Sequence, residues 1–243
     1  MTDAKQPSRV LYYLQDSRAF RVAWALEELE LEWELKQYMR VEGKRAVPEM
    51  KLESGNPYGK SPWLVDGDVE LGESAAIVRY LVERYGPQRG KADLLGKAGD
   101  WQSKGLVDAF ASFSEAAMIH TLVPVYSRWF TDTSTSLSVE KNMSANIHNN
   151  LDHLERTLSS NLEQYGPTNG PDAAFLVGDS ITAADILTAF TAEYTFGMDT
   201  AISSLGKKKE DWPNTVNWLK ALAQRPAYQR VKAKGAIHKF TIE

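Results

Sequence analysis

The chain has 243 residues and a formal net charge of -4 at pH 7, so its composition does not indicate the basic face that nucleic-acid binding favours. It contains no cysteine. This excludes disulfides, zinc–thiolate sites and any reaction that uses a thiol of the protein as nucleophile or redox pair. The four histidines do not have the spacing of a metal-binding pair on one helix face, so no metal site is expected.

The first eight residues are polar and lack the apolar region of a secretory signal. No segment is expected to span a membrane. We therefore expect a soluble protein of the cytoplasm.

The first third of the chain alternates between strand and helix patterns. Residues 10–14 form a short apolar run that predicts a buried strand, and residues 17–29 repeat apolar side chains at helical spacing. Ser17 is a natural N-cap for that helix. An alternating strand over 33–38 follows, and then a polar stretch with a short helix near 48–53.

A hairpin and a helix complete this region. Residues 62–65 and 69–71 flank a short gap that contains a glycine, which indicates a tight hairpin. Residues 74–85 form an amphipathic helix, which the Gly-Pro pair at 86–87 ends. The order strand, helix, strand, helix, hairpin, helix predicts a mixed four-stranded sheet covered by helices.

The second part of the chain shows no convincing strand. It follows a polar linker at 87–95, and the Ser/Thr-rich stretch at 131–138 is interpreted as a loop. The helices expected there cover 101–130, 139–164, 183–195 and 216–234.

A helix start is encoded near residue 182. Thr182 can cap the helix while Asp185, three residues on, bonds back to the amide of the capping residue. Ile181 and Ile186 can close the hydrophobic staple around this capping box. Its role is structural.

Four motifs occur in order along the chain. They are Asp-Ser-Arg-Ala-Phe-Arg at 16–21, Asn-Pro-Tyr-Gly-Lys-Ser-Pro at 56–62, Glu-Ser-Ala-Ala-Ile at 73–77 and Phe-Leu-Val-Gly-Asp-Ser-Ile-Thr-Ala-Ala-Asp at 175–185. Each motif alone is weak, but together they resemble the cytosolic glutathione S-transferase family. The similarity is closest to its fungal and bacterial branch, which has serine after the first strand.

This resemblance implies two domains. Residues 1–86 would form a thioredoxin-like glutathione-binding domain (βαβαββα), and residues 96–243 an all-helical bundle that binds the electrophile, with 87–95 as linker. It also implies a homodimeric transferase with a role in detoxification. Glutathione would be a co-substrate, and no cofactor, metal, nucleic acid or membrane partner is expected.

The reaction of this family requires the thiolate of glutathione, whose thiol is mostly protonated at neutral pH. Ser17, near the positive end of a helix, would donate to the sulfur together with backbone amides, and so would act as the catalytic residue without a general base. The alternative is a plain N-cap serine. Tyr12 and Tyr13 are rivals, because phenol hydroxyls do this work in other branches; in a strand, either could instead be core or line the electrophile pocket.

The resemblance also implies binding residues for the tripeptide. If the Ser61–Pro62 bond is cis, against the general preference for trans, the backbone of Ser61 would pair with the cysteinyl part. Glu73 and Ser74 precede a helix and would meet the γ-glutamyl ammonium and carboxylate, although an acidic helix start is a common feature in itself.

Cations would bind the glycyl carboxylate. Arg45 and Lys60 are the candidates, with Lys44 as substitute, and solvated surface charge is the alternative. The second substrate is expected between the domains, where aromatic residues of the first long helix could form its apolar wall or simply be core: Phe110, Phe113, Tyr126 and Trp129.

Two other functions stay open. A protein on this fold could bind glutathione or a hydrophobic ligand, or regulate another protein, without turnover. A glutathione-dependent reductase without a cysteine of its own could use two bound glutathiones.

Overall fold

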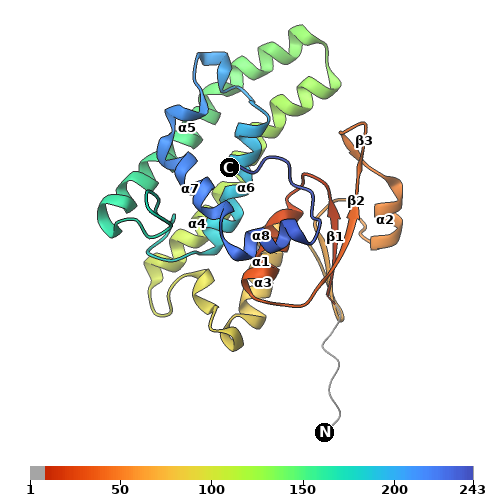
Figure 1. The fold of residues 1–243 in the computed structure, drawn as a ribbon. Coiled ribbons are helices and arrows are strands. Elements are labelled where there is room, and N and C mark those ends of the chain that lie inside the picture. The colour runs from red at the N-terminus through yellow and green to blue at the C-terminus, as the bar shows by residue number, and fades with distance from the viewer. Residues whose placement is uncertain (1–8, 243) are drawn as a thin grey trace. The chain divides into compact units, whose positions relative to one another are not determined.

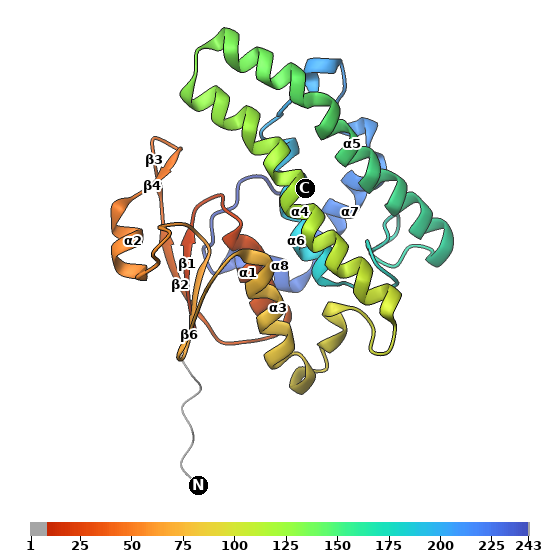
Figure 2. The same cartoon turned by 180° about the vertical axis from the view of Figure 1, so that it is seen from behind.

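The computed structural model describes residues 9–242, which divide into two units (Figures 1 and 2). The sheet unit extends to Lys91 and includes Pro226–His238; the helical unit is Ala92–Arg225 with the residues that follow His238. The segment 1–8, in which the sequence shows no secretory signal, lies outside the described residues.

The sheet unit contains the mixed four-stranded sheet that the sequence predicts. The strand order is β2-β1-β5-β6; β1 runs parallel to β2, and the other pairs are antiparallel. Gly67 takes φ +64 in the two-residue turn of the β5–β6 hairpin, a conformation that glycine adopts without strain. The strands are β1 (Arg9–Leu14), β2 (Glu34–Tyr38), β5 (Trp63–Asp66) and β6 (Val69–Gly72).

Helices cover both faces of this sheet. Figures 1 and 2 show α1 (Ala19–Glu28), α3 (Ser74–Tyr85) and α8 (Pro226–Ala233) on one side and α2 (Pro48–Ser54) on the other. A small hairpin of β3 (Arg40–Val41) and β4 (Arg45–Ala46) was not predicted, because two-residue strands carry no periodic pattern.

Helix α8 changes the predicted domain boundary. The sequence places residues 96–243 in one helical domain, whereas Pro226–His238 belongs to the sheet unit. The reason is aromatic packing: the fully buried ring of Tyr228 lies 4.8 Å from that of Phe20 and 5.1 Å from that of Trp24.

The helical unit is all-helical, as predicted. Its long helices are α4 (Trp101–Phe130), α5 (Thr133–Tyr165), α6 (Ala183–Gly197) and α7 (Pro213–Ala223). Short 3-10 helices, Pro87–Arg89 and Ala92–Leu95, occupy most of the predicted linker.

Two helix boundaries differ from the prediction. The loop expected at 131–138 is mostly helix, because the Asp132 carboxylate accepts the N–H of Thr135 at 3.0 Å and starts α5 there. The single helix expected over 216–234 is two helices, since Pro226 lacks the N–H that a continuous helix needs.

By length and composition, α4 could cross a membrane; the mean hydropathy of its most apolar 18-residue window is 1.3. A membrane-spanning segment was not expected from the sequence, and a single helix that meets this criterion is weak evidence for one. A core helix of a folded unit meets the same criterion, and α4 packs against α5 and α6. Only 33% of that window is buried, so much of the apolar surface of α4 is exposed.

A buried carboxylate organises the core of the helical unit. Asp185 has no exposed surface, and its Oδ1 accepts the N–H of Leu176 at 2.9 Å and the indole N–H of Trp218 at 3.0 Å. Its Oδ2 accepts the N–H and the hydroxyl of Thr182, which completes the predicted capping box. Burial raises the pKa of Asp185, and these donors oppose the rise.

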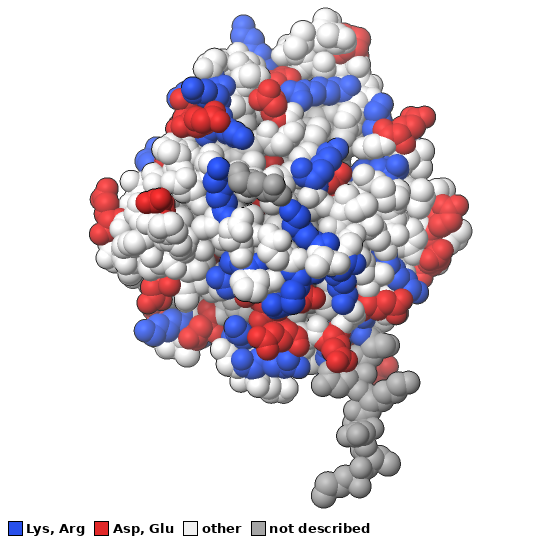
Figure 3. Space-filling view, in the orientation of Figure 1, with Lys and Arg blue, Asp and Glu red and all other residues white. Residues whose placement is uncertain are grey.

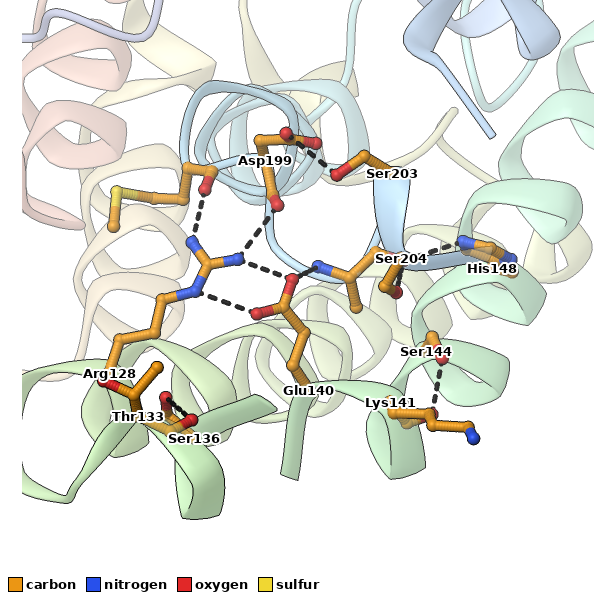
Figure 4. Close-up of polar contacts among 12 residues, drawn as sticks. Arg128, Thr133, Ser136, Glu140, Lys141, Ser144, His148, Asp199, Ser203 and Ser204 are labelled. Atoms are coloured by element: carbon orange, nitrogen blue, oxygen red, sulfur yellow. Dashed lines mark hydrogen bonds and ion pairs between the residues drawn. The ribbon is translucent and has the colours of Figure 1, made fainter. Parts of the chain in front are cut away.

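A second polar cluster fixes the end of α6 (Figure 4). The Arg128 guanidinium binds the Glu140 carboxylate through two hydrogen bonds, at 3.0 and 2.6 Å, and donates to the carbonyls of Met198 and Asp199. Glu140 in turn accepts the N–H of Ala201 at 2.9 Å. Asp199 and Ala201 have positive φ, so these contacts hold a strained turn in place.

The face of the molecule shown in Figure 3 carries lysine and arginine interspersed with aspartate and glutamate. This distribution agrees with the small net charge of -4.

We expect Asp185→Asn to destabilise the protein by about 3 kcal/mol, because the new NH₂ group would face donors and leave at least one without its acceptor. Asp152→Asn is the matched control, since Asp152 accepts the indole N–H of Trp212 at 2.7 Å and an amide oxygen can do the same. Urea unfolding followed by tryptophan fluorescence measures both. Equal midpoints for the two variants would contradict the role given to Asp185.

Candidate functional site

The turn between β1 and α1 positions Ser17. Asp16 takes φ +51, and its N–H donates to the carbonyl of Ile237 at 3.0 Å. The carbonyl of Ser17 accepts the N–H of Phe20, so the helix begins at Ala19 and Ser17 is not its N-cap, contrary to the prediction. Ser17 lies two residues before the first residue of the helix, and its side chain is 7% exposed.

The hydroxyls of Ser17 and Ser61 lie together. Their Oγ atoms are 3.2 Å apart, and Ser17 Oγ also accepts the N–H of Ala19 at 3.3 Å. Ser61 Oγ accepts the N–H of Leu14 at 3.0 Å and donates to the carbonyl of Tyr12 at 3.2 Å. The two serines, 44 positions apart in the sequence, thus share one hydrogen-bonded group at the end of β1.

Strand register explains how Ser61 reaches this place. Tyr12 pairs with Trp63, so continuing the antiparallel register puts Leu14 opposite Ser61. There the hydroxyl of Ser61, and not a backbone carbonyl, accepts the N–H of Leu14. The Ser61–Pro62 peptide bond is cis, as the resemblance implies.

The two rival tyrosines point to opposite faces of β1. Tyr13 is fully buried, and its hydroxyl donates to the carbonyl of Ile237 at 2.9 Å. Tyr12 is 9% exposed and stacks on Tyr38, with Lys36 Nζ 5.4 Å from its ring centre. Tyr13 is therefore held in the core by a structural hydrogen bond.

The start of α3 carries the next candidates. Glu73, in the N-cap position with φ +62, is exposed, and Ser74 is the first helical residue. Ser74 is therefore not the N-cap that the sequence suggests. Its hydroxyl accepts a hydrogen bond of 3.0 Å from the fully buried guanidinium of Arg21 in α1.

The three cation candidates lie on two other segments. Arg45 is exposed on β4, and Lys44, half-buried, precedes it. Lys60 is exposed in the loop before β5. The contacts above join Ser17 to Ser61 and Ser74 to Arg21; they do not extend to these cations.

Three supporting residues were missed by the sequence analysis. Arg21 holds Ser74; its signal was a cation inside the apolar run of α1. Asn56, 1% exposed, bonds the carbonyl of Lys60 at 2.6 Å and so shapes the loop before Ser61. Arg40 donates to the carbonyl of Lys44 at 2.7 Å and gave no sequence signal.

The four aromatic candidates on α4 do not form one wall. Phe110 and Phe113 pack with His153 and line a hollow of about 1100 Å³ in the helical unit. Tyr126 and Trp129 cluster more than three turns further along the helix, with ring centres 5.6 Å apart. Phe110 is 5% exposed, as a core residue would be.

No group of three His, Asp or Glu side chains in the described part of the chain could hold a metal ion.

Two family descriptions match the sequence. “Glutathione S-transferase, N-terminal domain” matches residues 7–83, and “Glutathione S-transferase, C-terminal domain” matches residues 118–226, which together exceed half of the chain. The chain belongs to the glutathione S-transferase family. The resemblance drawn from the four motifs is confirmed.

Individual glutathione S-transferases are similar over nearly the whole chain. Glutathione S-transferase 3 of Schizosaccharomyces pombe is 29% identical, over 90% of this chain and 84% of the relative. The crystal structure of a glutathione S-transferase from Actinobacillus pleuropneumoniae has a TM-score of 0.74 at 26% identity, over 96% of this chain and 95% of that one. A glutathione transferase from Phanerochaete chrysosporium, crystallised with oxidized glutathione, has a TM-score of 0.69 at 22% identity over 96% of each chain, which shows the fold alone.

We expect Tyr13→Phe to lower stability by about 1 kcal/mol, through loss of the hydrogen bond to Ile237, and to leave the pKa of bound glutathione unchanged. Urea unfolding and thiolate absorbance against pH measure the two effects. A rise of a full pKa unit in this variant would make Tyr13 the thiolate donor.

Proposed function

We propose that the protein is a glutathione transferase that stabilises the thiolate of glutathione with Ser17 and conjugates it to a hydrophobic electrophile. The observation that carries the proposal is the group at the end of β1, where the hydroxyls of Ser17 and Ser61 lie 3.2 Å apart immediately before α1.

Anion stabilisation follows from this position. A hydroxyl beside a helix start can donate to sulfur where the helix dipole favours negative charge. Such surroundings lower thiol pKa values from about 8.5 to roughly 3.5–7.5. The N-cap of α1 is Arg18 and not Ser17. Ser17 nevertheless lies only two residues before the first residue of α1, so its hydroxyl is still near the positive end of the helix.

The tripeptide would then extend away from Ser17. The backbone of Ser61, beside the cis bond to Pro62, would pair with the cysteinyl part. Glu73 and Ser74 at the start of α3 would receive the γ-glutamyl group. Arg45 and Lys60, with Lys44 as substitute, would bind the glycyl carboxylate.

The electrophile requires an apolar surface, and α4 provides one. Four apolar side chains recur at helical spacing and are between 42% and 54% exposed: Ile119, Val123, Tyr126 and Phe130. This set, here called the α4 stripe, forms the exposed apolar surface of the second half of α4. We assign it to the hydrophobic electrophile, in place of Phe110 and Phe113.

The remaining elements of the proposal come from family membership. They are a role in detoxification, a cytoplasmic location, a homodimeric state and no cofactor beyond glutathione as co-substrate. The similar Phanerochaete chrysosporium structure, which holds oxidized glutathione, supports binding of the tripeptide on this fold.

The test is calorimetric binding of glutathione, with thiolate absorbance followed against pH, for wild type and Ser17→Ala. Wild type should bind glutathione and lower its thiol pKa, and Ser17→Ala should bind it with a pKa at least about 1 unit higher. The matched control is Ser127→Ala, a buried serine of α4 whose hydroxyl contacts Thr131.

Each outcome separates the proposed functions. No glutathione binding by wild type would overturn the proposal and favour a carrier or regulatory protein on the same fold. Binding without conjugation of any electrophile would favour a binding protein, and reduction of a disulfide by two glutathiones would favour the reductase.

Val123→Ser should lower kcat/KM for chlorodinitrobenzene about fivefold, mainly through KM, because it removes about 1 kcal/mol of apolar contact. Leu205→Ser is the control, since Leu205 is similarly exposed, at 50%, but lies outside α4. An equal loss of kcat/KM in both variants would contradict the assignment of the α4 stripe.

A further inference from the structure

We infer that the hydroxyl of Ser61 is a positioning group that switches Ser17 into a donor toward the glutathione thiolate. The inference rests on the proposed function. It differs from the proposed binding role of Ser61, which involves the backbone and not the side chain.

A serine hydroxyl has one hydrogen and two lone pairs. Ser61 Oγ has three polar neighbours: the N–H of Leu14, which can only donate, the carbonyl of Tyr12, which can only accept, and Ser17 Oγ, which can do either. The single hydrogen of Ser61 therefore has two acceptors, both at 3.2 Å.

These two choices give Ser17 opposite roles. When Ser61 donates to the carbonyl of Tyr12, the bond between the serines requires Ser17 to donate to Ser61. The hydrogen of Ser17 is then used within the protein. When Ser61 donates to Ser17 instead, the hydrogen of Ser17 is released for an outside acceptor.

In the second arrangement every lone pair of Ser17 is occupied. One accepts the N–H of Ala19 at 3.3 Å, and the other accepts the hydroxyl of Ser61. The hydrogen of Ser17 can then point only at a group outside this cluster, and an incoming thiolate is such an acceptor. Hydrogen bonds in a chain polarise one another, so the chain from Leu14 through Ser61 and Ser17 to sulfur strengthens the last donor.

The sheet register holds Ser61 in this position. Leu14 lies opposite Ser61 when the register of β1 and β5 is continued by two residues. The N–H of Leu14 therefore needs an acceptor there, and the hydroxyl of Ser61 is that acceptor. The alternative role of Ser61 is purely structural, as an acceptor for Leu14. The two roles differ in one observable, the pKa of bound glutathione.

The experiment uses Ser61→Thr and Ser61→Val, which differ from each other only by a hydroxyl in place of a methyl group, together with Ser61→Ala. Glutathione affinity is measured by calorimetry, and the thiol pKa in the complex by thiolate absorbance. Val and Ala should raise that pKa by about 0.5–1 unit, and Thr should restore it to within about 0.3 unit of wild type. Tyr80→Phe, which removes the hydroxyl that bonds Asp66 near the other end of β1, should leave it unchanged.

A double-mutant cycle tests whether Ser61 acts through Ser17. In the Ser17→Ala background, Ser61→Val should produce no further rise in the pKa of bound glutathione. A further rise there would mean that Ser61 contacts the thiolate directly, which overturns the inference.

The remaining outcomes are separable. If wild type and Ser17→Ala differ as expected but Val and Thr at position 61 give the same pKa, the proposed function stands and this inference is wrong. If wild type does not lower the thiol pKa at all, the proposed function itself fails. If Ser61→Ala does not fold, the Thr and Val pair still decides.

Discussion

The pairing of β1 with β5 is the constraint on which the proposed chemistry depends. Tyr12 opposite Trp63 places Leu14 opposite Ser61, and the hydroxyl of Ser61 takes the N–H that the ladder would otherwise pair with a carbonyl. A shift of one residue in this register would turn every side chain of the strand to the other face. The contact between Ser17 and Ser61 thus depends on how the sheet is assembled, together with the cis bond between Ser61 and Pro62 and the turn at Asp16.

The two units offer different kinds of binding surface. The sheet unit concentrates hydroxyls and backbone amides near helix starts, which suits an anionic peptide. The helical unit fixes its core with buried polar groups, Asp185 above all, and leaves an apolar stripe on α4 exposed. A large exposed apolar surface on a helix is typical of a binding surface.

Sequence patterns predicted the elements better than their contacts. Helix α3 and helix α4 begin and end where periodicity places them, and the capping box at Thr182 follows from short-range spacing. Ser17 was recognised as a candidate but was wrongly predicted to be the N-cap. The actual start of α1 depends on a turn with positive φ at Asp16, which no local pattern signals. The hydroxyl contact of Ser61 and the buried bond from Arg21 to Ser74 join residues 44 and 53 positions apart, so only the tertiary fold reveals them.

The central claim is that this fold holds glutathione as a thiolate. The most direct measurement is the ultraviolet absorbance of the thiolate in the wild-type complex, titrated between about pH 5 and pH 9. We predict a midpoint below about pH 7, more than about 1.5 units under the value of about 8.5 for a free thiol, so that bound thiolate predominates at neutral pH. A bound thiol that ionises at the same pH as the free tripeptide would contradict it.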